Sequence, residues 1–422
     1  MPGHLVEIIA TVLFVIAIVH TFSVPVFARL ANKNGPHAGL WHMLSEVEAV
    51  FGVWAFVLVI VMALVAGAGE AVQYLDSRNF TEPAFVFVIM VVAASRPIID
   101  LVTMIVHAVA KLLPIDRAVS TFFVIMALVP LAGSFITEPA AMTLAALLLR
   151  DGYFRKPGQA GFKYLAIGVL FVNISIGGVM TAYAAPPVLM VANAFGWDSG
   201  YMATHFGWRA AIAVIINASV LTFLSRQYLK AGMIGASESE QKRARTPFSV
   251  IGVHLLVLIG VVLGAHHPAF FLGLFMMFVG YTHAYPQYQD NLMIREGLMV
   301  GFFLAGLIVL GGLQQWWLQD LLGGLAPMVL FWGSAALTAV TDNAALTYLG
   351  SLVEGTTETW RYMLVAGAVT GGGLTVIANA PNPAGFAILK NCFPDGAISP
   401  AKLIMSAALP TLVAAGMFLL PV

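Results

Sequence analysis

The sequence predicts an all-α polytopic membrane protein with about ten transmembrane helices and two re-entrant hairpins, arranged in two inverted-topology repeats. Of its 422 residues 60% are hydrophobic and only 9% are charged, whereas a soluble domain carries roughly 25% charged residues. Apolar runs of about 18 or more residues recur along the chain, and each is long enough to cross a bilayer. A polar motif near residue 137 also returns near residue 341.

The apolar runs fall into two groups of five. We expect spanning helices over residues 5–28, 45–68, 84–111, 163–190, 205–228, 249–265, 267–287, 293–313, 361–388 and 401–421. Two further apolar stretches, 119–150 and 322–354, each hold a polar break at their middle. Non-helical backbone at membrane depth persists only inside protein or beside a water-filled cavity. These two stretches are therefore predicted to be re-entrant hairpins.

The two halves of the chain have the same order of elements. Residues 1–230 and 249–422 each read as three helices, a hairpin, a broken helix (163–190 or 361–388) and a final helix. The polar stretch 231–248 between them is predicted to be a cytoplasmic linker. Because five spans is an odd number, the second half enters the membrane with the opposite orientation, as in an inverted repeat.

Basic residues predict the orientation. With both termini outside, all but four of the 20 Lys and Arg residues fall on the cytoplasmic side or its boundary, as the positive-inside rule requires. The exceptions are Arg78, Arg96, Arg209 and Arg361. The formal net charge is zero, and no basic run suggests a nucleic-acid partner. Cys392 is the single cysteine, which excludes an intrachain disulfide and a thiol-ligated metal cluster.

Each hairpin carries an acid beside threonines at its predicted tip. A carboxylate at mid-membrane costs roughly 2.5–3.5 kcal/mol on insertion scales, so two at equivalent places indicate a function. A carboxyl group that holds either a proton or a metal ion makes the two compete for one site. The predicted cation- and proton-binding residues, which would hold Na+ at the hairpin tips, are Thr137, Glu138, Thr143, Thr341, Asp342, Asn343 and Thr347.

Glycines and prolines interrupt the helix that follows each hairpin. Proline removes a backbone donor and clashes with the preceding turn, and the freed carbonyls become available to a hard cation, which prefers oxygen ligands. The residues predicted to form this unwound-helix site are Gly177, Gly178, Thr181, Pro186, Gly372, Gly373, Thr375, Asn379 and Asn382.

Structural roles remain open for several of these residues. Glu138 and Asp342 are also suitable as helix caps that accept from backbone donors, and the glycines as points of close helix packing in lipid. Arg96, Asp100 and His107 share one stripe of the third span. They are read either as a self-neutralising structural pair or as a proton relay through His107.

Two strings in the second half resemble the motifs of the ion-transporter superfamily: Thr341-Asp342-Asn343-Ala344, and the segment from Gly371 through Asn379-Ala380-Pro381-Asn382-Pro383. This superfamily includes NhaD-type antiporters and arsenite, citrate and dicarboxylate carriers. Within it the chain is most similar to the putative Na+/H+ antiporter family. The resemblance implies a homodimer in a bacterial inner membrane, with a scaffold subdomain and a moving transport subdomain that holds both hairpins. Carboxylate carriers usually have Ser-Asn-Thr at the tips, which this chain lacks.

The predicted function is therefore exchange of Na+ or Li+ for H+ by alternating access. No cofactor and no transition-metal site are expected. A sodium- or proton-coupled carrier of organic or oxyanion substrates is the alternative within the same fold, in which case Arg96 or Arg209 would face the substrate. An intramembrane enzyme is a third reading. It is not favoured, because His-Glu-x-x-His and Gly-x-Ser-x-Gly motifs are missing from the sequence.

Overall fold

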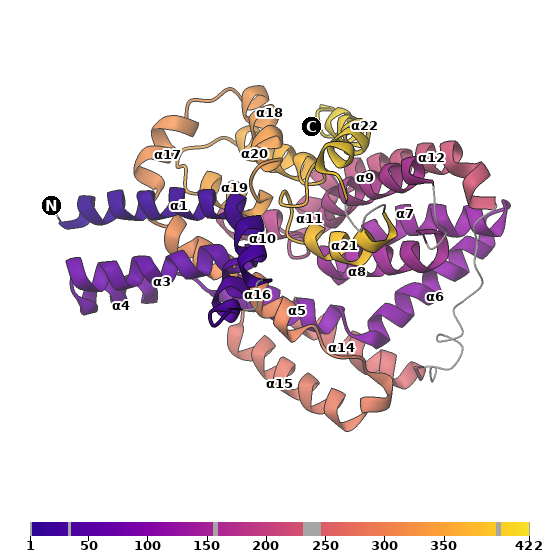
Figure 1. Cartoon of the computed structure of the whole chain (residues 1–422), viewed down its shortest axis with the longest axis horizontal. Coiled ribbons are helices and arrows are strands. Elements are labelled where there is room, and N and C mark those ends of the chain that lie inside the picture. Colours follow the sequence, from indigo (N-terminus) through magenta and orange to yellow (C-terminus); the bar gives the residue numbers. More distant parts are fainter. Residues whose placement is uncertain (1, 33–34, 155–158, 231–245, 394–397, 422) are drawn as a thin grey trace.

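The computed structural model describes residues 2–32, 35–154, 159–230, 246–393 and 398–421, and within these ranges the regular elements are all helices (Figure 1). Most of the predicted linker 231–248 lies outside the described residues. The first half contains α1 (Pro2–Ala31), α2 (Ala38–Leu44), α3 (Val47–Val65), α4 (Ala68–Asp76), α5 (Thr81–Ala93), α6 (Arg96–Leu112), α7 (Arg117–Ile136), α8 (Glu138–Leu149), α9 (Ala160–Gly177), α10 (Pro186–Phe195), α11 (Ser199–Met202) and α12 (Trp208–Lys230).

The second half continues the all-helical pattern. It contains α14 (Phe248–Leu263), α15 (Pro268–Ala284), α16 (Ile294–Gly311), α17 (Gln315–Leu322), α18 (Pro327–Thr338), α19 (Asn343–Ser351), α20 (Glu358–Gly371), α21 (Asn382–Leu389) and α22 (Pro400–Phe418). Many of these helices begin at proline, which is pre-organised for the first helical turn and loses no hydrogen bond there. Others begin after a capping side chain, and Asp116, for example, accepts from the backbone N–H groups of Ala118 and Val119.

Seven helical segments of the described chain are long and apolar enough to cross a membrane, or eight if the bent pair α5–α6 counts as one span. They include α7, which we expected to be one arm of a re-entrant hairpin. Helices α14 and α15 have 16 and 17 residues, slightly fewer than the roughly 20 that a straight span needs. The protein is thus an all-helical, multi-pass membrane protein.

The prediction of one continuous helix over residues 84–111 is wrong. The chain bends by 63° between α5 and α6, at Ala94 and Ser95. Pro97 lies in the first turn of α6, and Ser95, directly before that turn, has an extended backbone with a ψ of 146°. Proline also cannot donate to the carbonyl four residues earlier. The single Ser-Arg-Pro sequence therefore ends one helix and begins another in a new direction.

Helix α9 is the most buried of the candidate membrane spans in the described chain. Within the span Ala160–Met180, 94% of the residues in its apolar 18-residue stretch are buried. Helix α9 packs against α7, α12, α20 and α22. In contrast, α1 and α3 pack side by side at the left of Figure 1, and α1 exposes many of its apolar side chains. Helices α14 and α15 form a further pair at the bottom of this view. The buried centre is where the interrupted helices of both halves meet.

Candidate cation and proton site

The first tip lies between α7 and α8, where Thr137 separates Ile136 from Glu138. Thr137 has a φ of 71°, a left-handed conformation that is unfavourable for a β-branched residue. Such strain costs on the order of 1–3 kcal/mol and is concentrated at functional sites. The carboxylate of Glu138 does not cap α8, since Oε2 accepts from Asn379 and Oε1 has no hydrogen-bond partner within the described chain. The cap interpretation therefore does not describe Glu138.

The Glu138 side chain is completely buried. It lies between the two helix breaks, which are residues 178–185 between α9 and α10 and residues 372–381 between α20 and α21. Its Oε2 atom accepts a hydrogen bond of 2.9 Å from Nδ2 of Asn379. Its Oε1 atom has no hydrogen-bond partner among the described residues. A Cβ atom at Gly178 would lie only 2.5 Å from Oε1. The break after α9 thus places the backbone of Gly178 against the carboxylate, whereas the break after α20 supplies the amide donor of Asn379.

Several oxygens close to this carboxylate in the chain or in space share its lack of partners. Buried side-chain oxygens without a hydrogen-bond partner in the described chain are Oγ1 of Thr137 and Oδ1 of Asn343, Asn379 and Asn382. Leaving a buried polar group unsatisfied costs roughly 1–3 kcal/mol. Hydroxyl, amide and carboxylate oxygens are the ligands that hard cations take. Of these residues, Asn379 contacts Glu138 directly and Thr137 precedes it in the chain.

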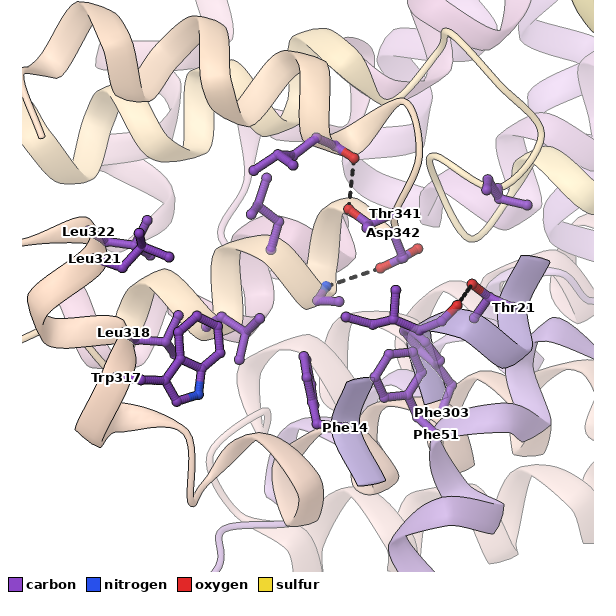
Figure 2. Close-up of a pocket in the computed structure, with 16 residues that line it drawn as sticks. Phe14, Thr21, Phe51, Phe303, Trp317, Leu318, Leu321, Leu322, Thr341 and Asp342 are labelled. Atoms are coloured by element: carbon purple, nitrogen blue, oxygen red, sulfur yellow. Dashed lines mark hydrogen bonds between the residues drawn. The ribbon is translucent and has the colours of Figure 1, made fainter. Parts of the chain in front are cut away.

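The second tip is built differently, because Asp342 is a helix cap. Its Oδ1 atom accepts from the backbone N–H groups of Ala344 (2.8 Å) and Ala345 (3.1 Å) at the start of α19. The cap interpretation therefore describes one of its two carboxylate oxygens. The side chain is half-buried and lines a cavity of about 240 Å³ (Figure 2). The walls of this cavity come from α1, α3, α16, α17, α18 and α19.

The break between α20 and α21 connects the two tips. The carbonyl of Ala378 accepts a hydrogen bond of 3.1 Å from the backbone N–H of Asn343, next to Asp342, while Asn379 binds Glu138. Asn382 fixes the loop from inside, since its Nδ2 atom donates to the carbonyls of Gly372 and Thr375, each at 2.8 Å. One short irregular segment therefore contacts both acidic tips.

Gly372 and Gly373 bring the backbone close to other groups of the site. A Cβ at Gly372 would lie 2.8 Å from Nδ2 of Asn343 and would also overlap the hydroxyl of Ser175. Gly373 lies against Val172 of α9. Gly372 and Gly373 thus allow close packing against α9 and Asn343, which is the structural role considered for the glycines from the sequence.

A serine that sequence reasoning missed holds the break between α9 and α10 together. Ser134 of α7 donates to the carbonyl of Gly177 (2.7 Å) and accepts from the N–H of Met180 (2.9 Å). Thr181 donates to the carbonyl of Ser134 at 2.6 Å. Pro186 then begins α10. The signal in the sequence is a small hydroxyl residue one helical turn before Glu138, inside an otherwise apolar helix.

The remaining predicted threonines use their hydroxyl protons on backbone carbonyls. Thr341 donates to Leu337, Thr347 to Ala344, and Thr375 to Ala339. Oγ1 of Thr143 is buried without a hydrogen-bond partner within the described chain. Ser175, which sequence reasoning also missed, donates to the carbonyl of Val369 at 2.7 Å and joins α9 to α20.

Arg96 and Asp100 form an ion pair at the start of α6, with 3.6 Å between Nε and Oδ2. Asp100 also accepts a hydrogen bond of 2.5 Å from the hydroxyl of Thr246, just before α14. Arg96 donates to the carbonyl of Gln287 at 3.5 Å. His107 lies on α6, seven residues after Asp100. These contacts join α6 to the segments around α14 and α15, which favours a structural pair over a relay.

Arg209 is buried near the end of α22 and donates to backbone carbonyls. Its Nη2 atom donates to the carbonyl of Pro421 at 2.8 Å, and Nη1 donates to the carbonyl of His205. The guanidinium also lies 4.5 Å above the ring of Trp208. The arginine considered for an organic-anion carrier thus holds the end of a helix.

Two interrupted helices and a buried carboxylate among amide oxygens, within a bundle of apolar helices, are typical of ion transporters of the membrane. The described residues contain no group of three or more His, Cys, Asp and Glu side chains arranged to hold a metal ion. The model of the family described as "Putative Na+/H+ antiporter" matches residues 5–421, and the chain belongs to this family. The resemblance inferred from the second tip is thereby confirmed. No curated protein matches the chain. The family points to a transporter.

Proposed function

We propose that the protein exchanges Na+ or Li+ for H+ by alternating access, and that Glu138 holds the proton and the cation in turn. One observation carries the proposal: the carboxylate is fully buried, one oxygen accepts from Asn379, and the other has no partner within the described chain. An isolated buried carboxylate is costly unless it is neutralised or paired. Either a proton or a cation removes that cost, and both cannot occupy Oε1 together.

The surroundings of Glu138 support a cation as the second occupant. The amide oxygens of Asn343, Asn379 and Asn382 and the hydroxyl of Thr137 offer neutral oxygen ligands. The carboxylate belongs to the first turn of α8, and a helix N-terminus favours negative charge. A monovalent cation with one carboxylate and several neutral oxygens leaves the site without net charge, which suits a buried position.

Asp342 is proposed to be the second carboxylate of the exchange cycle. It lies on the wall of a cavity, whereas Glu138 is enclosed, so the two acids differ in access in this conformation. Helix α8 packs along α21, and α10 packs along α19. Each tip helix therefore contacts the broken helix of the other half. This crossed packing supports the further proposal of two inverted repeats with re-entrant hairpins, whose tips are reached alternately from opposite faces of the membrane. The proposal places the protein in a bacterial inner membrane as a homodimer, as the resemblance to the ion-transporter superfamily implies.

Exchange is tested in proteoliposomes with an imposed pH gradient and an internal pH-sensitive dye. We expect Na+ or Li+ to collapse the gradient, and choline to leave it intact. Asp342→Asn should reduce the Na+ response to that of protein-free vesicles. Asparagine is as good a helix cap as aspartate, so α19 should persist while the charge is lost.

Asp116→Asn is the matched control, because Asp116 caps α7 through two backbone N–H groups in the same way and is exposed. Its exchange rate should equal that of the wild type. A wild-type gradient that persists after Na+ and Li+ are added would reject the proposed function.

A further inference from the structure

The cavity beside Asp342 has almost no polar group to offer apart from the carboxylate. The hydroxyl of Thr21 donates to the carbonyl of Ile18, and that of Thr341 to the carbonyl of Leu337 (Figure 2). Nε1 of Trp317 donates to Oε1 of Gln314 at 2.9 Å. The remaining side chains of the wall are aliphatic or phenyl groups. The cavity therefore combines one formal negative charge with an apolar lining.

One oxygen of Asp342 remains for a ligand. Oδ1 is used by the backbone N–H groups of Ala344 and Ala345, and no hydrogen bond within the described chain engages Oδ2. In Figure 2 the carboxylate lies at the side of the cavity toward Phe51 and Phe303. The cavity supplies one carboxylate and two threonine oxygens at most, which is fewer oxygens than the six to eight of a hard-cation cage such as a Ca²⁺ site.

The aromatic residues of the wall suit a different kind of cation. Four helices, α1, α3, α16 and α17, supply the aromatic residues Phe14, Phe51, Phe303 and Trp317. Aromatic faces attract organic ammonium groups, with about 0.5–2 kcal/mol for each contact. An apolar body fills the rest of such a site by the ordinary hydrophobic effect. The volume of about 240 Å³ is a little below the roughly 300–1,000 Å³ of drug-sized pockets, so the ligand is small.

We propose that this cavity binds a small lipophilic monocation, an alkylammonium with an apolar or aromatic body, whose charged head pairs with Oδ2 of Asp342. This ligand goes beyond Na+/H+ exchange but shares Asp342 with the proposed exchange cycle. The assignment rests on the composition of the cavity and not on Glu138. Both the charge and the apolar wall are required, because a neutral analogue lacks the ion pair and a metal ion lacks the apolar body.

Equilibrium binding to the purified full-length protein in detergent tests the proposal, with radiolabelled 2-phenylethylamine and its neutral analogue 2-phenylethanol as probes. At neutral pH the amine is charged, as lysine is. We expect the wild type to bind the amine at least about tenfold more tightly than the alcohol, since a charge-assisted hydrogen bond contributes about 1.5–3 kcal/mol. Asp342→Asn should lower amine binding to the level of the alcohol.

Two further variants separate this cavity from the enclosed carboxylate of Glu138. Ala345→Leu fills the cavity from α19 while the backbone cap of Asp342 is kept, and it should abolish binding of both probes. Glu138→Gln should leave amine binding unchanged. Equal affinity for amine and alcohol, or amine binding that survives Asp342→Asn, overturns the proposal. Because no ion flux is measured, a protein that fails to exchange Na+ for H+ but binds the amine refutes only the proposed function.

Discussion

Glu138→Gln is expected to abolish Na+-dependent proton movement completely. Glutamine has the shape of glutamate and can still accept from Asn379, so the packing around α8 should be kept. It cannot hold an exchangeable proton, and it contributes no charge to a cation. Loss of one charge-assisted contact of about 1.5–3 kcal/mol lowers cation affinity roughly 10- to 100-fold. The dye assay in proteoliposomes measures the first effect, and equilibrium binding of radioactive Na+ measures the second.

Glu70→Gln serves as the control for this variant, because Glu70 lies exposed on α4 and its charge change is identical. It should exchange at the wild-type rate. Thermal unfolding of Glu138→Gln in detergent should remain cooperative. If Glu138→Gln exchanges Na+ for H+ at the wild-type rate, the assignment of the shared carboxylate to this residue is wrong.

Gly178→Ala is expected to weaken Na+ binding strongly, by displacing the carboxylate of Glu138 without removing it. The new Cβ would lie 2.5 Å from both Cγ and Oε1 of Glu138, well inside ordinary van der Waals contact. The end of a flexible side chain can move, so the protein should fold, at an overpacking cost of about 1–3 kcal/mol. The carboxylate then leaves its place beside Asn379. We expect Na+ affinity to fall tenfold or more, measured as the Na+ concentration for half-maximal dye response.

Gly273→Ala provides the matching control for Gly178→Ala. A Cβ at Gly273, in α15, would meet nothing within 4 Å, so the same chemical change should leave the Na+ response as in the wild type. An unchanged Na+ response in Gly178→Ala would mean that the carboxylate does not need its observed position.

The membrane class and the family could be predicted because they rest on many residues at once. Composition and long apolar runs are properties of the whole chain. The end of α9 at Gly177 and the start of α21 at Asn382 follow from local chemistry, since glycine pairs and prolines act on the backbone within one or two residues. Such effects can be read without knowledge of the neighbours.

Features that depend on tertiary contacts could not be predicted. The bend before Pro97 was hidden, because one proline in an apolar run can either kink a helix or end it. Ser134 was overlooked for a similar reason: a buried serine acquires its role only when another helix break lies against it. The pairing of α8 with α21 and of α10 with α19 joins residues more than one hundred positions apart, and no local pattern specifies it.

The two acids look alike in sequence but differ in space. Pro139 follows Glu138, whereas Asn343 follows Asp342. Aspartate is short enough to cap its own helix, and Asp342 does so. The longer side chain of Glu138 reaches away from α8 to Asn379. This difference leaves an enclosed carboxylate in one half and a cavity-facing carboxylate in the other.

Proton release on cation binding is the most direct test of a carboxylate that is shared between Na+ and H+. Purified protein in a weakly buffered detergent solution is mixed with NaCl or choline chloride, and a pH indicator records released protons. Displacement of a proton from a ligand group makes metal binding pH-dependent. We predict that NaCl releases protons from the wild type and that Glu138→Gln lowers this release by on the order of one proton per chain. Binding of radioactive Na+ to the wild type without proton release, or a release that Glu138→Gln leaves unchanged, would contradict the account.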